Sequence, residues 1–347
     1  MKKIKVAING FGRIGRAFLK VALEHPEIEL VALNEVGDIK NMSYLLKYDT
    51  AYGTSDFTVT TGAAKKESNQ LAIFVDGREI LYLSEKEPAS LPWKVLGIDV
   101  VVESTGLFTS YEKAKAHLDA GAKRVVITAP AKDVVGAQAA ATVLMGVNED
   151  KIGTCPITSN ASCTTNTGSP LIAILDDAIG IEKAILNTVH GYTASQGLVD
   201  GPNKRDFREG RAAGQNIVPS STGAAIAVTK AYPNLNGKFD GISVRVPVVV
   251  GSLVDVTFIA KRSTTKEEVN SILSAAAKMP RWEGIFTVTD EPLVSSDIVG
   301  NRHASIADLP LTRVVDGNLV KVMAWYENEM GYANTLVRHV LEAGKIA

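Results

Sequence analysis

The stretch from Ile4 to Arg16 reads IKVAINGFGRIGR and decides the fold of the first part of the chain. Its β-branched residues predict a strand over 4–8, and the apolar spacing after Gly12 predicts a helix that ends before Pro26. The glycines between them allow a tight turn and let a pyrophosphate lie at the helix N-terminus. Because 29–33 reads as a second strand, we expect a βαβ unit of a parallel sheet that binds a dinucleotide.

An acidic residue stands where such a turn requires one. The dinucleotide fingerprint needs a carboxylate about 20 positions after its glycines, at the end of the second strand, to bind the adenosine ribose. Glu35 occupies this place. Its charge would repel a 2′-phosphate, so we expect NAD rather than NADP. The alternative is a structural glycine turn followed by an unrelated acid, but strand, glycines, helix and acid are all in register.

Length and composition exclude several classes of protein. A chain of 347 residues suits two domains, and 37 Lys and Arg against 38 Asp and Glu give no field that attracts nucleic acid or an anionic membrane. Two cysteines are too few for a disulfide framework and predict free thiols in a reducing compartment. The N-terminal apolar run is too short for a signal peptide, and 134–147 is too short to span a membrane. We expect a cytoplasmic protein with no membrane partner, no nucleic-acid partner and no metal.

The pattern of predicted elements changes about halfway along the chain. Short strands alternate with helices at first, whereas later strands are longer and more widely spaced. We predict an α/β Rossmann-type dinucleotide-binding domain over 1–160 and an α+β catalytic domain with a mainly antiparallel sheet over 161–330. A C-terminal helix over about 331–347 is expected to pack back on the first domain. Further strands are predicted over 71–75, 100–103, 124–128, 184–189, 241–246, 253–259 and 319–325, and a helix over 111–118.

Cys163 stands in a run of small polar residues, 159–166, directly before an apolar helical pattern. A helix N-terminus favours thiolate over thiol, so we expect a lowered pKa and a nucleophile at this position. A small buried residue is the alternative, and it is the more frequent situation for a single cysteine. Cys155 only enters a strand and is expected to be structural.

Two further residues could assist such a thiol. His190 ends an apolar strand and begins a polar turn, so a thiol and this imidazole together would form an activated nucleophile pair. Arg245 lies late in another apolar strand, where its charge needs either a protein carboxylate or a ligand anion. The hydroxyl groups of 220–222 either cap the helix that follows or line an anion site. The long polar loop 195–217 is expected to be functional.

Taken together, these segments resemble the glyceraldehyde-3-phosphate dehydrogenase family. The run around Cys163 is the most specific landmark, and the landmarks follow the family's order over nearly the whole chain. They lie at 7–16, 159–166, 190–193, 219–225, 245–247 and 325–332.

The resemblance implies NAD-dependent oxidative phosphorylation of D-glyceraldehyde 3-phosphate to 1,3-bisphosphoglycerate. Cys163 would attack the aldehyde to give a thiohemiacetal, and His190 would act as the base while hydride leaves for NAD. Inorganic phosphate would then release the acyl group from the resulting thioester. The substrate phosphate would be held by Thr193 and Arg245, and the attacking phosphate by Ser162, Thr164, Thr222 and Gly223.

The resemblance also implies a cofactor site and an assembly. Asn328 would bind the nicotinamide carboxamide, with Tyr332 nearby. The remaining cofactor contacts would come from Gly10, Phe11, Gly12, Arg13, Ile14, Glu35 and Thr128. The family's homotetramer is expected, with the loop 195–217 near a subunit interface, and its reaction serves both glycolysis and gluconeogenesis.

Two departures from the family's pattern stand out. Glu35 replaces the Asp that most members carry, and Glu also occurs in the related erythrose-4-phosphate dehydrogenases. Erythrose-4-phosphate dehydrogenase is therefore the alternative activity. The stretch 134–142 looks longer and richer in Ala than usual, and we assign it no function.

Overall fold

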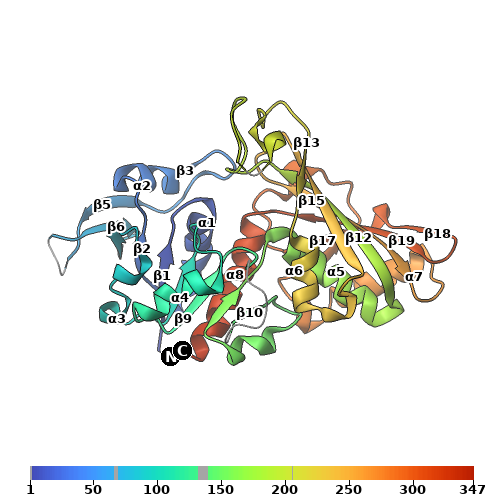
Figure 1. Ribbon diagram of the computed structural model, residues 1–347, viewed down its shortest axis with the longest axis horizontal. Coiled ribbons are helices and arrows are strands. Elements are labelled where there is room, and N and C mark those ends of the chain that lie inside the picture. The colour runs from blue at the N-terminus through green and yellow to red at the C-terminus, as the bar shows by residue number, and fades with distance from the viewer. Residues whose placement is uncertain (1, 66–68, 132–139, 205) are drawn as a thin grey trace. The chain divides into compact units, whose positions relative to one another are not determined.

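The computed structural model describes residues 2–65, 69–131, 140–204 and 206–347. Most of the stretch 134–142 therefore lies outside the described residues. The chain divides into two compact units (Figure 1). The first unit comprises residues 1–143, 149–161 and 336–347, and the second comprises 144–148 and 162–335.

A mostly parallel sheet forms the first unit, in the strand order β10-β11-β9-β8-β1-β2-β7-β6-β5. The pairs from β10 to β7 are parallel, and β6 and β5 extend one edge in antiparallel fashion. The order β7-β2-β1-β8-β9-β11 is that of a doubly wound dinucleotide-binding fold, which confirms the predicted fold of this part. The elements are β1 (Ile4–Asn9), α1 (Arg13–Ala22), β2 (Ile28–Asn34), α2 (Ile39–Lys47), β3 (Tyr48–Asp49), β4 (Gly53–Thr54), β5 (Val59–Ala63), β6 (Leu71–Val75), β7 (Arg78–Leu83), α3 (Trp93–Leu96), β8 (Val100–Glu103), α4 (Tyr111–Asp119), β9 (Arg124–Ile127), β10 (Ala140–Thr142) and β11 (Ile157–Ser159).

The central strands are apolar on both faces because the sheet is covered on both sides. Val100, Val101 and Val102 are fully buried, and Trp93 packs with Val101 in the core on one side of the sheet. The strand order reverses between β1 and β8, and ligands of such sheets bind at the carboxyl ends of the strands at this point. Here these ends are Asn9 on β1 and Glu103 on β8.

A mainly antiparallel sheet forms the second unit, in the order β13-β14-β12-β15-β19-β17-β16, with β18 paired to β19. Among the described strands, only β12 with β14 and β16 with β17 run parallel. The predicted α+β fold is confirmed. Helix α5 packs against several of these strands (Figure 1). The elements are α5 (Cys163–Ile179), β12 (Ile181–Gly191), β13 (Val218–Ser221), α6 (Ala224–Ala231), β14 (Phe239–Val246), β15 (Ser252–Ala260), α7 (Lys266–Ala276), β16 (Phe286–Thr289), β17 (Ser305–Asp308), β18 (Arg313–Val315), β19 (Leu319–Tyr326) and α8 (Met330–Lys345).

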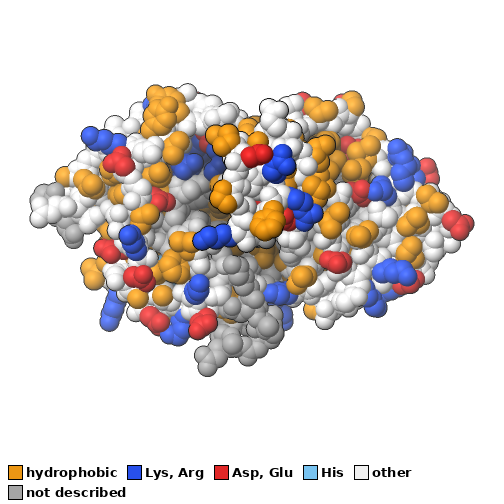
Figure 2. Space-filling model, turned by 45° about the horizontal axis from the view of Figure 1, so that its top comes forward, with side chains coloured by type: hydrophobic (Ala, Val, Ile, Leu, Met, Phe, Trp, Pro, Cys, Tyr) orange, Lys and Arg blue, Asp and Glu red, His pale blue; other side chains and the backbone are white. Residues whose placement is uncertain are grey.

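One face of this second sheet is not fully covered by the residues that the structure describes. Along β15, every second residue is buried and the residues between them are only partly buried, as expected for a strand with one face on a core. Ile185 on β12 and Ile242 on β14 are more than half exposed. Figure 2 shows charges of both signs interspersed with hydrophobic side chains over one face of the molecule. No helix within the described residues has the length and apolar character needed to cross a membrane.

Candidate active site

Cys163 is the first residue of α5, because the residue before it caps that helix. The Ser162 hydroxyl accepts a hydrogen bond of 3.1 Å from the Thr165 N–H and lies 2.7 Å from the Thr165 hydroxyl. Serine is among the best helix-capping residues, so this local sequence sets the start of the helix. The prediction of a thiol at a helix N-terminus is confirmed.

The pKa of the Cys163 thiol is raised, whereas the sequence predicted a lowered pKa. Burial raises the pKa of Cys163 to about 11, although the Arg245 cation and the N–H and hydroxyl of Thr164 act in the opposite direction. The predicted lowering is wrong because the helix start is itself enclosed, and desolvation of a thiolate outweighs the favourable dipole. The unliganded protein therefore holds a thiol at neutral pH, and this thiol needs a base.

His190 lies near the end of β12 and supplies a suitable base. Its Nε2 atom is 3.4 Å from the Cys163 Sγ atom, so the structure brings together the two residues that the sequence could only suggest as a pair. Burial and the Arg245 cation lower the pKa of His190 to about 3, so the imidazole is neutral at physiological pH. A neutral imidazole beside a thiol can accept its proton.

The other ring nitrogen of His190 has two competing neighbours. Its Nδ1 atom lies 2.6 Å from the Gly191 carbonyl oxygen and 2.6 Å from the Arg245 Nη1 atom. A proton on Nδ1 that is donated to the carbonyl leaves Nε2 able to accept the thiol proton. Arg245 can only donate, so its contact favours the opposite tautomer. The position of Arg245 therefore controls which nitrogen is basic.

Arg245 reaches this position through the pairing of two parallel strands. Residue 245 on β14 is the register partner of His190 on β12. Within the described residues Arg245 has no carboxylate partner; its acceptors are His190 and the Gly191 carbonyl at 3.3 Å, and its buried Nε atom has none. A buried cation without an acidic partner is suited to bind a ligand anion. Of the two hypotheses for Arg245, the structure therefore favours anion binding over a salt bridge.

Two of the predicted phosphate ligands lie close to these residues in the chain. The Thr164 hydroxyl is buried and lies 2.8 Å from the Tyr326 hydroxyl, which also contacts Thr188 at 2.7 Å. Thr193 follows β12, with its hydroxyl 3.1 Å from the Ser195 hydroxyl. Both hydroxyls are therefore held in place by neighbouring hydroxyl groups.

The other predicted phosphate ligands open helix α6. The Thr222 hydroxyl accepts a hydrogen bond of 3.1 Å from the Ala224 N–H, and Gly223 precedes the helix. A Cβ atom built on Gly223 would meet nothing within 4 Å, so the space beside this backbone is open. Within the described residues, no hydrogen bond links Thr222 or Gly223 to Cys163, His190 or Arg245.

The glycine turn of the first unit has the form that a pyrophosphate requires. Gly10 has a φ of +93°, and a Cβ atom on it would lie 2.6 Å from the Thr105 nitrogen, so no other residue fits. A Cβ atom on Gly15 would strike the Gly10 carbonyl oxygen. No side chain caps α1, and the space beside Gly12 is open. The N–H groups at this helix start can therefore bind an anion.

Glu35 follows β2 and lies against this turn. Its Oε2 atom accepts a hydrogen bond of 2.8 Å from the Phe11 N–H, and its Oε1 atom accepts one of 3.1 Å from the Gly37 N–H. The Phe11 ring is fully buried, so only the backbone of this residue can contact a ligand. The carboxylate is held at the edge of the turn, in the position that the fingerprint assigns to a ribose ligand.

Three other predicted cofactor ligands of this unit are Arg13, Ile14 and Thr128, and their contacts do not by themselves indicate a bound cofactor. Arg13 pairs with Asp49 through two contacts of 3.1 and 3.3 Å, a partner that the sequence did not indicate. Ile14 is partly buried in the first turn of α1. The Thr128 N–H donates to the Glu103 carbonyl at 3.0 Å, just after β9.

In the Asn328 side chain of the second unit, the amide oxygen is hydrogen-bonded and the amide nitrogen is available to a ligand. Its Oδ1 atom accepts hydrogen bonds from the Gly251 N–H at 3.0 Å and from the Ser252 hydroxyl at 3.1 Å. The amide nitrogen has no partner among the residues that the structure describes. Tyr332, in the first turn of α8, is buried.

Two features of the structure escaped the sequence analysis. Tyr326 connects Thr164 to Thr188 and lies edge-on to the His190 ring at 5.8 Å between centroids. Glu103 is a buried carboxylate at the end of an apolar strand, the same signal that drew attention to Arg245. In the described part of the chain, no group of three or more His, Cys, Asp or Glu could hold a metal.

Comparison with known proteins places this geometry in context. A family model described as the NAD binding domain of glyceraldehyde 3-phosphate dehydrogenase matches residues 4–111, and the model of the C-terminal domain of that enzyme matches residues 162–328. The chain is 48% identical to glyceraldehyde-3-phosphate dehydrogenase of Mycobacterium avium and 46% identical to that of Zymomonas mobilis, each over 99% of both chains. It is also 46% identical to the enzyme of Borreliella burgdorferi, over 96% of this chain and 98% of that one.

Proposed function

The chain belongs to the glyceraldehyde-3-phosphate dehydrogenase family, and on this premise we propose how its residues carry out the family's reaction. It is an NAD-dependent phosphorylating aldehyde dehydrogenase that oxidises glyceraldehyde 3-phosphate. Residues 1–160 serve as the NAD-binding domain, and residues 161–330 serve as the catalytic domain. The helix over about 331–347 completes the first of these.

The observation that carries the mechanism is the group formed by Cys163, His190 and Arg245. The thiol transfers its proton to the Nε2 atom of His190, 3.4 Å away, and its sulfur attacks the aldehyde carbon. His190 returns this proton to the carbonyl oxygen, which gives the thiohemiacetal and leaves the imidazole neutral again. His190 then takes the hydroxyl proton of the thiohemiacetal as hydride leaves, which gives the thioester. NAD, when bound, supplies the hydride acceptor.

Arg245 couples substrate binding to the activation of this base. Its contact with the Nδ1 atom of His190 favours the wrong tautomer, and it has no carboxylate partner within the described residues. A substrate phosphate that binds Arg245 and Thr193 draws the guanidinium away from the ring. The Nδ1 proton can then be donated to the Gly191 carbonyl, 2.6 Å away, and Nε2 becomes the acceptor.

The acyl acceptor, inorganic phosphate, binds beside the thioester. Hydroxyl groups and the N–H groups at the start of α6 are suitable donors for this anion. Its ligands are Ser162, Thr164, Thr222 and Gly223. Attack of a phosphate oxygen on the thioester carbon breaks the carbon–sulfur bond and releases 1,3-bisphosphoglycerate. The sulfur leaves as a thiolate, and the proton held by His190 restores the thiol of Cys163.

The dinucleotide is held by residues whose geometry suits its parts. The open space beside Gly12, at the start of α1, fits the pyrophosphate, and Glu35 fits the adenosine ribose. The free amide nitrogen of Asn328 donates to the nicotinamide carboxamide, with Tyr332 nearby. The other contacts come from Phe11, Gly12, Arg13, Ile14 and Thr128.

The chain acts as a cytoplasmic homotetramer that serves glycolysis and gluconeogenesis. Two apolar surfaces support self-association: the face of the second sheet that exposes Ile185 and Ile242, and the loop 195–217, in which Leu198 and Phe207 are each 88% exposed. Analytical ultracentrifugation of the purified protein tests the assembly, and a monomeric species at micromolar concentration would contradict it.

The substrate assignment is tested by comparing two phosphorylated aldehydes. We measure the initial rate of NADH formation with glyceraldehyde 3-phosphate and with erythrose 4-phosphate, in saturating NAD and phosphate. A large ratio of kcat/KM in favour of the triose is expected. A ratio near one or below would show that the turn after His190 does not select substrate length.

A further inference from the structure

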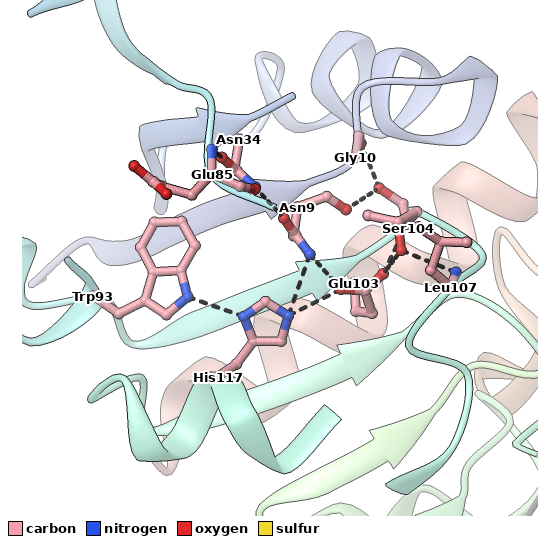
Figure 3. Close-up of polar contacts among 10 residues, drawn as sticks. Asn9, Gly10, Asn34, Glu85, Trp93, Glu103, Ser104, Leu107 and His117 are labelled. Atoms are coloured by element: carbon pink, nitrogen blue, oxygen red, sulfur yellow. Dashed lines mark hydrogen bonds and ion pairs between the residues drawn. The ribbon is translucent and has the colours of Figure 1, made fainter. Parts of the chain in front are cut away.

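A buried polar network lies beneath the dinucleotide turn. It joins the carboxyl ends of β1, β2 and β8 to helix α4 (Figure 3). The side chains at its centre are almost fully buried: Asn9, Asn34, Trp93, Glu103 and His117 are between 0% and 5% exposed. None of them can contact a ligand through its side chain to any large extent.

Glu103 accepts hydrogen bonds at both oxygens. Its Oε1 atom accepts from the Thr105 N–H at 2.9 Å and from the Thr105 hydroxyl at 2.5 Å. Its Oε2 atom accepts from the Asn9 amide at 2.6 Å and from His117 Nε2 at 2.9 Å. Within the described residues this carboxylate contacts no Lys or Arg.

The position of the proton on His117 follows from its neighbour on the Nδ1 side, since the Asn9 amide nitrogen, 3.4 Å from Nε2, is bonded more closely to Glu103 at 2.6 Å. The Trp93 indole N–H, which can only donate, lies 3.0 Å from the Nδ1 atom of His117. Nδ1 must therefore carry a lone pair, and the proton of the neutral ring lies on Nε2, facing Glu103. Figure 3 shows the imidazole between the indole and the carboxylate.

The orientation of the two asparagines is fixed in the same way. The Glu85 N–H donates to Asn34 Oδ1 at 2.8 Å, so the Asn34 amide nitrogen faces Asn9 and donates to its Oδ1 atom at 2.7 Å. The Asn9 amide nitrogen must then face Glu103. Two chains of hydrogen bonds, one from a backbone N–H and one from an indole N–H, end on this carboxylate. Glu103 is consequently the acceptor for every donor around it.

The network is connected directly to the glycine turn. Asn9 precedes Gly10, and the Ser104 hydroxyl donates to the carbonyl oxygens of both residues, at 3.0 and 2.7 Å. The Thr105 backbone, which Glu103 holds, is the surface against which Gly10 lies. Asn34 precedes Glu35 and accepts at its carbonyl the Gly10 N–H at 2.9 Å. A shift of Glu103 would therefore move both the turn and the ribose ligand.

We propose that Glu103 is a positioning residue for the dinucleotide: its buried carboxylate holds the pyrophosphate turn and Glu35 in register, so that NAD affinity depends on it while hydride transfer does not. The inference rests on the proposed NAD-binding role of this unit. Four charge-assisted or polar bonds to one carboxylate give a fixed geometry that an apolar core could not provide.

The test is the variant Glu103→Gln, which keeps the shape and replaces one oxygen with an amide donor. Because every neighbour donates, the new NH₂ group must face a donor in either orientation. NAD binding is measured by calorimetry without substrate, and we expect a dissociation constant raised about 10- to 100-fold, the effect of one lost charge-assisted hydrogen bond. The KM for NAD should rise in parallel, with kcat at saturating NAD within about twofold of the wild type.

Asp99→Asn is the matched control. Asp99 directly precedes β8, at the opposite end of that strand from Glu103, and its buried carboxylate accepts from the Lys5 N–H at 2.9 Å and from Lys123 Nζ at 2.6 Å. This variant should lower the unfolding temperature but leave NAD affinity unchanged. Equal effects of the two variants on stability with wild-type NAD affinity in both would overturn the proposal, since Glu103 would then be merely structural.

A second substitution tests the assigned proton directly. Trp93→Phe removes the indole donor, so His117 can move its proton to Nδ1 and accept at Nε2. In the Glu103→Gln background this change should recover part of the lost NAD affinity, whereas in the wild type it should not improve binding. If Trp93→Phe improves binding in neither background, the proton assignment and the proposal built on it fail.

A milder variant keeps the proposal testable if Glu103→Gln does not fold. His117→Phe removes one donor from the carboxylate at a residue with no exposed surface, and NAD binding should weaken about 3- to 10-fold. Wild-type affinity in a folded His117→Phe protein would overturn the proposal. Failure of the wild type to bind NAD would instead overturn the proposed function itself.

Discussion

Replacement of Arg245 by Met is the most informative single change. The Nη2 atom of Arg245 has no partner among the described residues and carries two N–H groups, so two charge-assisted bonds to the substrate phosphate are available. At about 1.5–3 kcal/mol for each such bond, the loss is about 3–6 kcal/mol, or about 10²- to 10⁴-fold in kcat/KM for glyceraldehyde 3-phosphate.

The second substrate in this experiment is unphosphorylated glyceraldehyde. It has no phosphate to lose, and removal of Arg245 takes away the donor that competes for the Nδ1 atom of His190. Loss of the Arg245 cation also raises the pKa of the Cys163 thiol, so the kcat/KM of this aldehyde should fall, but far less than that of the phosphorylated aldehyde. The assay is the initial rate of NADH formation for both substrates, at saturating NAD and phosphate and a single pH.

The ratio of the two kcat/KM values separates binding from chemistry. Arg262→Met is the control, because Arg262 is an exposed cation of the same unit that pairs with Glu268 at 2.8 Å, and neither substrate should respond to its loss. Equal losses for the phosphorylated and unphosphorylated aldehydes in Arg245→Met would refute the reasoning, since Arg245 would then act on the reacting atoms rather than on the phosphate.

Three further predictions follow from the same site. Cys163→Ser should abolish NADH formation while calorimetry still detects NAD binding, and unaffected turnover would remove Cys163 from the mechanism. The Arg245 cation lowers the pKa of the Cys163 thiol, so Arg245→Met should raise it and slow alkylation by iodoacetamide at any fixed pH below that pKa; faster alkylation would reverse the assigned sign. Glu35→Gln removes the charge that opposes a 2′-phosphate and should raise kcat/KM with NADP relative to NAD, whereas an unchanged ratio would place the source of the preference elsewhere.

Many of the strands could be predicted from the local pattern of apolar residues alone. The strands predicted at 71–75 and 100–103 have these bounds in the structure, and those at 241–246 and 253–259 lie within β14 and β15. Their apolar or alternating residues are a direct consequence of burial on one or two faces. Short edge strands such as β10 were missed, because three residues at the edge of a sheet carry too little pattern to recognise.

The active site could be predicted only in part, because several of its contacts join residues that are far apart in the chain. A capped helix start at Cys163 is a local property, and the sequence predicts it. The distance from this thiol to His190 and the parallel register of His190 with Arg245 depend on residues far apart in the chain. The direction of the pKa shift of the Cys163 thiol was predicted wrongly. Desolvation depends on the whole surrounding structure, whereas the effect of the helix dipole can be inferred from the neighbouring residues.

The division of the chain has a consequence for the order in which the protein can mature during synthesis. The first unit includes residues 336–347, in which Leu336, Val337 and Val340 are fully buried, yet residues 162–335 of the second unit separate them in the sequence from the rest of the first unit. A ribosome therefore completes the second unit before it completes the first. Until α8 has been synthesised, the apolar surface that it covers in the first unit stays exposed to solvent. We expect chaperones to bind the nascent chain mainly during this interval.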